Sequence, residues 1–108
     1  MTKLLIGVAQ LNSRDNINDN LAIINGLIQE AGSRGVEWLS FPENSLFLSS
    51  DSTITPPVLY PKSDALQTIR KAASKWNMTI LLGGVGEASS SPTKVHNSSC
   101  VIYPDTRD

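Results

Sequence analysis

The tripeptide Phe41-Pro42-Glu43 places a carboxylate directly after a short apolar run, residues 36–41, that is typical of a buried strand. The carboxyl ends of strands are where α/β folds carry their chemistry. Pro42 stops strand pairing and fixes a backbone angle just before Glu43. The sequence therefore indicates Glu43 as a candidate catalytic residue that a rigid support directs out of the sheet. The alternative interpretation is a solvated glutamate in a turn.

Very little else in the chain could complete a catalytic site with this carboxylate. Cys100 is the only cysteine and sits in an apolar run without a flanking Lys or Arg, so we expect a buried structural thiol rather than a nucleophile. His96 is the only histidine and has no cluster of Cys, Asp or Glu around it. A zinc site is therefore not expected, and we expect His96 to order a strand start or a loop.

Three further polar residues have ordinary interpretations. We expect Glu87 to be a loop charge, with a place at the edge of a site as the alternative, and Lys94 to be solvated. Asn97 could hydrogen-bond to backbone at a strand start.

The run Gly83-Gly84-Val85-Gly86 lacks the Lys-Ser/Thr pair and the following helix of a phosphate-binding loop, so nucleotide binding is not expected.

Composition limits the class of protein. The 108 residues suffice for one small domain or part of a larger one. A formal net charge of -1 without basic or acidic blocks argues against nucleic acid and membrane surfaces as main partners. The apolar run at residues 4–9 is too short to span a membrane and lacks a signal-peptide cleavage region. The single cysteine cannot form a disulfide within the chain, which favours a reducing compartment. Together these features predict a cytoplasmic location.

The first half of the chain predicts a strand, a helix and a second strand. Residues 4–10 are apolar on both faces, as expected for a central strand. Residues 12–16 supply an N-cap for a helix of about four to five turns, which Gly32 or Gly35 would end. Its apolar face consists of Ile17, Leu21, Ile24, Ile28 and Ala31.

The second half predicts a long loop, a helix and two strands. The loop covers about residues 44–62, and Ser63 or Asp64 then caps a helix that Asn77 ends. The predicted strands cover residues 78–82, ended by Gly83-Gly84, and 99–103, with a polar loop at 86–94 between them and a turn from Pro104 onward. The helix face is Leu66, Ile69, Ala73 and Trp76, and Trp38 joins Trp76 as an expected core residue.

This order, β-α-β-α-β-β, predicts an α/β fold with parallel strands and an antiparallel last pair. Two helices can cover only one face of a sheet that is apolar on both. We therefore expect the chain to be an incomplete domain that buries its other face against further sequence or a partner. The end at residues 106–108, inside a predicted hairpin turn, agrees with a truncated chain.

Several short motifs follow one another along nearly the whole chain. They are Ile6-Gly7-Val8-Ala9-Gln10, Asn20, Phe41-Pro42-Glu43-Asn44, Gly83-Gly84 with Glu87, and His96-Asn97-Ser98-Ser99 leading into Val101-Ile102-Tyr103-Pro104-Asp105. In this order they resemble the amino-terminal part of the nitrilase superfamily, the carbon–nitrogen hydrolases. Within that family the chain is similar to the small amidases of the omega-amidase and deaminated-glutathione amidase type.

The resemblance implies that residues 1–108 form the N-terminal portion of one α-β-β-α sandwich domain in a homo-oligomeric parent enzyme. It also implies hydrolysis of a small amide or nitrile by a Glu-Lys-Cys set without a metal or other cofactor. In that set a thiol attacks, a carboxylate moves protons and a lysine stabilises the tetrahedral oxygen. Glu43 matches the general base, whereas the lysine and cysteine are expected beyond Asp108. The chain alone is then predicted to be inactive.

Two alternatives stay open at this point. The chain could be a non-catalytic truncated isoform or a fragment that binds other subunits, because an uncovered apolar sheet favours association. It could also be an unrelated small α/β binding module of flavodoxin type, which a five-stranded parallel sheet would support.

Overall fold

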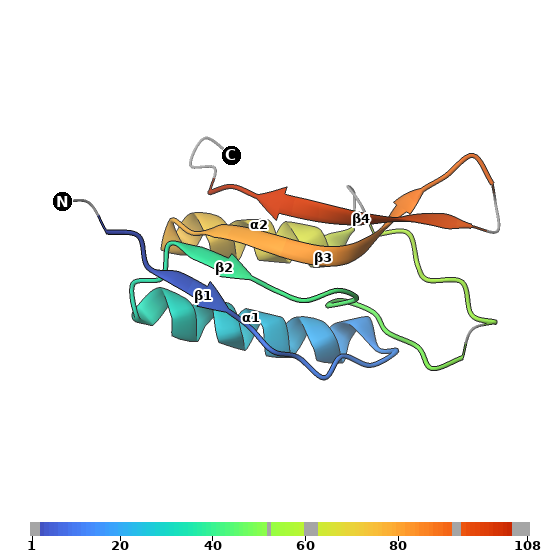
Figure 1. The fold of residues 1–108 in the computed structure, drawn as a ribbon, viewed down its shortest axis with the longest axis horizontal. Coiled ribbons are helices and arrows are strands. Elements are labelled where there is room, and N and C mark those ends of the chain that lie inside the picture. The colour runs from blue at the N-terminus through green and yellow to red at the C-terminus, as the bar shows by residue number, and fades with distance from the viewer. Residues whose placement is uncertain (1–2, 52, 60–62, 92–93, 105–108) are drawn as a thin grey trace.

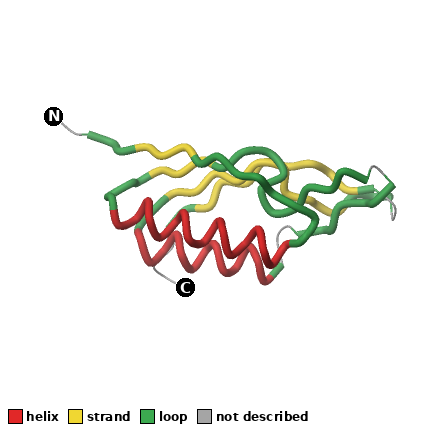
Figure 2. Tube along the Cα trace, turned by 90° about the horizontal axis from the view of Figure 1, so that it is seen from below, coloured by secondary structure: helices red, strands yellow, loops and turns green. Residues whose placement is uncertain are grey.

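The computed structural model describes residues 3–51, 53–59, 63–91 and 94–104. The strands of this part form one four-stranded sheet in the order β1-β2-β3-β4, and both helices lie on the same face of it (Figures 1 and 2). The predicted α/β order is confirmed. The elements are β1 (Ile6–Val8), α1 (Ile17–Ser33), β2 (Trp38–Ser40), α2 (Asp64–Trp76), β3 (Thr79–Ala88) and β4 (Val95–Ile102).

The strand pairing follows the predicted pattern, except for the place of the first strand. β1 pairs with β2 in parallel, β2 pairs with β3 in parallel, and β3 pairs with β4 in antiparallel. In the described part of the chain β1 lies at the edge of the sheet, so the expected central position is not observed there. Its apolar side chains Ile6 and Val8 are 57% and 84% exposed. The apolar side chains of the first strand therefore lie on a sheet face that the described residues leave uncovered.

Local capping explains both ends of α1. The Asn16 side chain accepts a hydrogen bond of 3.0 Å from the Asp19 backbone N–H, and the carboxylate of Asp19 lies in the first turn. After the last turn Gly35 adopts a φ of +80°, which glycine tolerates best. Gly35 is thus the terminator. Gly32, the other candidate, lies inside the helix and packs against the ring of Trp76.

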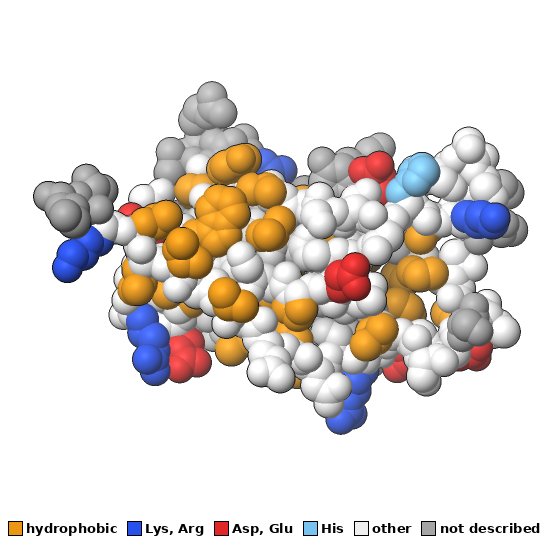
Figure 3. Space-filling view, viewed as in Figure 1, with side chains coloured by type: hydrophobic (Ala, Val, Ile, Leu, Met, Phe, Trp, Pro, Cys, Tyr) orange, Lys and Arg blue, Asp and Glu red, His pale blue; other side chains and the backbone are white. Residues whose placement is uncertain are grey.

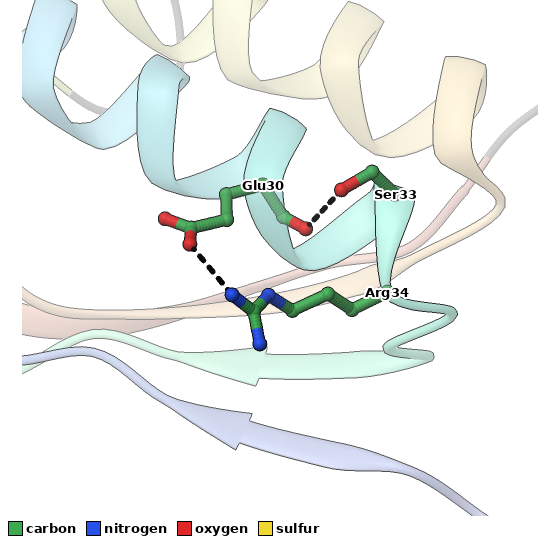
Figure 4. Close-up of polar contacts among 3 residues, drawn as sticks. All are labelled: Glu30, Ser33 and Arg34. Atoms are coloured by element: carbon green, nitrogen blue, oxygen red, sulfur yellow. Dashed lines mark hydrogen bonds and ion pairs between the residues drawn. The ribbon is translucent and has the colours of Figure 1, made fainter.

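Arg34 and Ser33 complete the C-terminal end of α1 (Figure 4). The Arg34 Nη2 atom lies 3.2 Å from Glu30 Oε1, and the Ser33 hydroxyl donates a hydrogen bond of 2.7 Å to the Glu30 carbonyl. A cation at this end is favoured by the helix dipole. The pair is solvent-exposed, so we expect it to add only a few tenths of a kcal/mol.

The caps of α2 are also local. The Ser63 side chain accepts a hydrogen bond of 3.2 Å from the Leu66 N–H, and Asn77 ends the helix with a left-handed φ of 49°.

The helices and the sheet enclose one apolar core. Its larger members are Ile24, Ile28, Leu39, Phe41, Leu46, Leu59, Leu66, Ile69, Met78, Ile80, Leu82, Val85 and Ile102.

The prediction for Trp38 is wrong. Leu39 faces the core and successive strand residues alternate, so Trp38 lies on the uncovered face of the sheet. There it is half-buried, and its Nε1 atom donates a hydrogen bond of 2.9 Å to the Ser40 hydroxyl.

The last two strands are longer than predicted. β3 continues through Gly83-Gly84 to Ala88, with a shift of register against β4 between Leu82 and Val85. Gly84 has a φ of +69°, so it accommodates this irregularity instead of ending the strand. Residues 86–88 of the expected polar loop therefore belong to β3, so Glu87 is not a loop charge but pairs with His96 in the ladder. The turn expected after Pro104 lies outside the described residues.

The face of the sheet opposite the helices carries apolar side chains, which gather over the strands in Figure 3. We call this surface the open face and define it by Ile6, Val8, Val101 and Tyr103. These residues are 57%, 84%, 40% and 67% exposed. The prediction that two helices leave one face uncovered is confirmed for the described residues.

Candidate functional site

The turn that follows β2 carries Glu43. Pairing with β3 extends one residue past β2, because the Phe41 N–H donates a hydrogen bond of 2.8 Å to the Leu81 carbonyl. Pro42 then ends the ladder, and Glu43 is exposed at the carboxyl end of the strand. Asn44 follows with a positive φ of 55°, which reverses the chain. The position predicted for Glu43 is thus the one observed.

Glycines of β3 let this turn lie directly against the sheet. A Cβ atom on Gly83 would come within 3.0 Å of the Glu43 backbone nitrogen and the Pro42 carbonyl oxygen. A Cβ atom on Gly84 would overlap the backbone nitrogen of Asn44. The sequence pattern predicts that these glycines end a strand. Because they have no side chains, they allow the turn that carries Glu43 to approach β3 closely.

Hydrogen bonds hold the turn from its other side. The Ser45 hydroxyl donates to the Pro42 carbonyl, and the Ser13 hydroxyl donates a bond of 2.7 Å to the Ser45 carbonyl. The Asn20 Nδ2 atom, from α1, donates a bond of 2.8 Å to the Leu46 carbonyl. We call Ser13, Asn20 and Ser45 the polar clamp.

The sequence prediction missed Ser13 and Ser45 and gave Asn20 no role. One signal was available for Asn20, because it lies four residues before Ile24 on a helix face that is otherwise apolar. A polar residue on such a face requires a buried partner.

A pocket of about 410 Å³ begins beside this turn and extends to the start of β4. Asn44 and Gly84 form one side of it, whereas Lys94, His96 and Asn97 come from the β4 side. The structure therefore brings these three predicted polar residues toward the residue next to Glu43. The remaining lining residues are Phe47, Ile54, Thr55, Pro56, Pro57, Leu59, Gly86 and Val95.

The long loop between β2 and α2 forms the outer wall of this pocket. The Leu59 N–H donates a hydrogen bond of 2.9 Å to the Gly86 carbonyl, which pins the loop to β3. Farther out, the Asp51 carboxylate accepts bonds of 2.9 Å and 2.6 Å from the Thr53 N–H and hydroxyl, and these bonds lower the pKa of Asp51. A loop with these contacts is suited to shaping a binding site.

The thiol of the chain is not part of this arrangement. Cys100 pairs with Leu82, is half-buried and packs against the core. Burial raises its pKa, so little reactive thiolate forms near neutral pH. This agrees with a structural role. Among the described residues there is also no group of three or more His, Cys, Asp or Glu side chains that could hold a metal ion.

A search of the described helices finds none long and apolar enough to cross a membrane.

The family model described as carbon–nitrogen hydrolase matches residues 5–107. The chain is 36% identical over 102 residues to a probable hydrolase nit2 of Schizosaccharomyces pombe, and 27% identical over 113 residues to a deaminated glutathione amidase of Synechocystis. These alignments cover 93% and 100% of this chain but only 37% and 40% of the relatives. The chain thus spans about two fifths of the length of these relatives.

Solved structures of related proteins share the fold. The NitFhit protein of C. elegans matches with a TM-score of 0.77 at 22% identity, over 93% of this chain and 25% of that protein. A carbon–nitrogen hydrolase of Helicobacter pylori matches with a TM-score of 0.69 at 14% identity, over 94% of this chain and 36% of that protein.

Proposed function

This chain belongs to the carbon–nitrogen hydrolase family, and we propose that the protein carrying it hydrolyses a small amide or nitrile with Glu43 as general base. In the preferred reaction an amide yields a carboxylic acid and ammonia. Residues 1–108 supply the N-terminal portion of one domain in this proposal. Family membership excludes the alternative of an unrelated binding module.

The observation that supports the proposal is the placement of Glu43. Its side chain is exposed at a strand end, whereas its backbone is held against β3 by glycines and on the other side by the polar clamp. A general base needs this combination, because it must reach the substrate site and keep its geometry.

In the proposed reaction Glu43 takes the proton of a cysteine thiol as the sulfur attacks the amide carbonyl. A lysine ammonium stabilises the tetrahedral oxyanion, and ammonia leaves with a proton returned from Glu43. Glu43 then activates a water molecule that hydrolyses the thioester and releases the acid.

The lysine and the nucleophile belong to sequence outside residues 1–108 in this proposal. Cys100 is a poor candidate because burial raises the pKa of its thiol. Lys94 is a surface residue of the pocket in this proposal, not the catalytic lysine. We therefore propose that the 108-residue chain alone has no amidase activity. We also propose that the parent protein is a cytoplasmic homo-oligomer without a cofactor.

The test compares two polypeptides: the product of the uninterrupted reading frame that contains these 108 codons, and the 108-residue chain itself. Each is incubated with a panel of small monoamides, and ammonia release is measured. We expect turnover by the longer product and none by the chain. Turnover by the chain itself would overturn the assignment of lysine and nucleophile to outside sequence.

The open face favours a second candidate, association of the chain with other subunits without catalysis. Val8 and Tyr103 on that face are 84% and 67% exposed, and clustered apolar surface of this kind promotes association. Gel filtration tests it. A monomer that unfolds cooperatively would contradict this candidate.

A further inference from the structure

The buried polar side chains of the described part are Asn20 and Ser45, which are 3% and 1% exposed. Both bond to backbone in the turn that carries Glu43. Ser45 bonds to the carbonyl of the residue before Glu43, and Asn20 bonds to the carbonyl three residues after it. The two buried polar residues of the described part therefore both bond to the segment that presents the exposed carboxylate.

Asn20 is fully engaged. Its Oδ1 atom accepts a hydrogen bond of 2.9 Å from the Arg14 N–H, and its Nδ2 atom donates bonds of 2.7 Å and 2.8 Å to the carbonyls of Arg14 and Leu46. One side chain thus joins α1, the loop before it and the turn after β2. The Leu48 N–H adds a direct bond of 2.9 Å to the Arg14 carbonyl.

This arrangement joins the turn to two parts of the fold, β3 and the start of α1. Gly83 and Gly84 set its approach to β3, and the hydrogen bonds of the polar clamp prevent it from moving away. Burying an amide on an otherwise apolar helix face is unfavourable unless its bonds are made, so such a residue specifies one geometry more than it adds stability.

We propose that Asn20 is a positioning residue for Glu43, acting through the Leu46 carbonyl and the loop at Arg14. The inference rests on the proposed function of Glu43 as general base. Ser13 has the same task with a single bond to the Ser45 carbonyl.

The competing explanation is that Asn20 only stabilises the start of α1. Asn16 provides the matched control, because it caps the same helix through one bond to the Asp19 N–H and is exposed. A variant of Asn16 weakens the helix start without removing a bond to the Glu43 turn.

The experiment measures amide hydrogen exchange along the chain in Asn20→Asp, Ser13→Ala and Asn16→Ala. The Asn20→Asp variant keeps the side-chain shape but loses both N–H donors. We expect amides of residues 43–48 to exchange about tenfold to a hundredfold faster in Asn20→Asp, relative to amides of α2 in the same sample. In Asn16→Ala the increase should be confined to the first turn of α1.

The same variants in the longer, active protein give a second readout. Asn20→Asp should lower kcat about tenfold to a hundredfold and change KM less than kcat, because the base is misplaced while most of the pocket lining lies outside residues 43–48. Asn16→Ala should leave kcat unchanged.

Unchanged exchange of residues 43–48 in Asn20→Asp, or an equal increase in Asn16→Ala, would overturn the inference. If Asn20→Asp does not fold, Ser13→Ala replaces it in the comparison with Asn16→Ala. The expected increase in the exchange rate of residues 43–48 is then smaller. The exchange result does not depend on turnover. A turn that loosens in Asn20→Asp while Glu43→Gln leaves ammonia release intact would therefore contradict the proposed function alone.

Discussion

The helix layer and the Glu43 turn are held by different forces. Apolar packing joins α1 and α2 to the sheet, and Ile24, Ile28 and Ile69 are fully buried in that layer. The turn after β2 places Leu46 in the same core, and it is held in addition by the polar clamp and by close backbone contacts at Gly83 and Gly84. Packing supplies most of the stability of a small domain, whereas hydrogen bonds and shape fix where one residue points. The position of the turn that carries Glu43 is thus specified by hydrogen bonds and backbone contacts as well as by burial.

The largest effect is expected at the contact between β3 and the turn. In Gly84→Ala the new Cβ overlaps the Asn44 backbone, and the φ of +69° is unfavourable for alanine. We expect the free energy of unfolding in urea to fall by about 2–4 kcal/mol.

Gly35→Ala is the control for that variant, because Gly35 has a similar φ of +80° and no described atom beyond its two chain neighbours lies within 4 Å of the place where the new methyl group would stand. It should lose only about 1–2 kcal/mol. Equal losses in the two variants would mean that backbone strain, rather than the contact with the turn, determines the result.

A smaller effect is expected between the helices. Gly32→Ala places a methyl group into the ring of Trp76, so we expect a loss of about 1–3 kcal/mol in thermal or urea unfolding. Gly26→Ala lies in the same helix, and its new methyl group would have no described atom within 4 Å beyond its chain neighbours and the backbone of its own helix. This variant should instead gain about 0.5–1 kcal/mol from helix propensity. Stabilisation by both substitutions would show that α1 and α2 are packed less closely than the structure indicates.

The smallest effect concerns Cys100. Burial raises the pKa of its thiol, so the unfolded chain loses this proton at a lower pH than the folded chain. The native state then binds more protons, and the stability contributed by Cys100 falls as pH rises above the ordinary thiol value of about 8.5. The difference in unfolding free energy between the natural chain and Cys100→Ala should narrow between about pH 7 and pH 10. A constant difference would show that the thiol titrates alike in both states.

Sequence patterns predicted the helix layer well because its signals are local. The caps at Asn16, Ser63 and Asn77 act within a few residues, and the apolar spacing of both helices identified their buried faces. The pattern could not separate Gly32 from Gly35 as terminators, because the contact of Gly32 with Trp76 joins residues far apart in the chain. It also could not show that β3 continues past Gly84, whose positive φ accommodates a shift of register instead of ending the strand.

The candidate site was predicted only in part. The strand-end position of Glu43 follows from the residues before it. The polar clamp joins residues that are 26 and 32 positions apart, and no local pattern encodes such pairs. The same limit applies to the pocket, whose walls come from the turn, the long loop and β4.

The most direct test of Glu43 as general base is the kcat/KM of the parent protein that we propose, with Glu43→Gln and with Glu87→Gln as the matched control. Both changes neutralise a carboxylate near the pocket, but Glu87 lies in the β3–β4 ladder opposite His96. We predict a loss of about a hundredfold to ten-thousandfold for Glu43→Gln and little change for Glu87→Gln. Full activity of a folded Glu43→Gln variant would contradict the central claim.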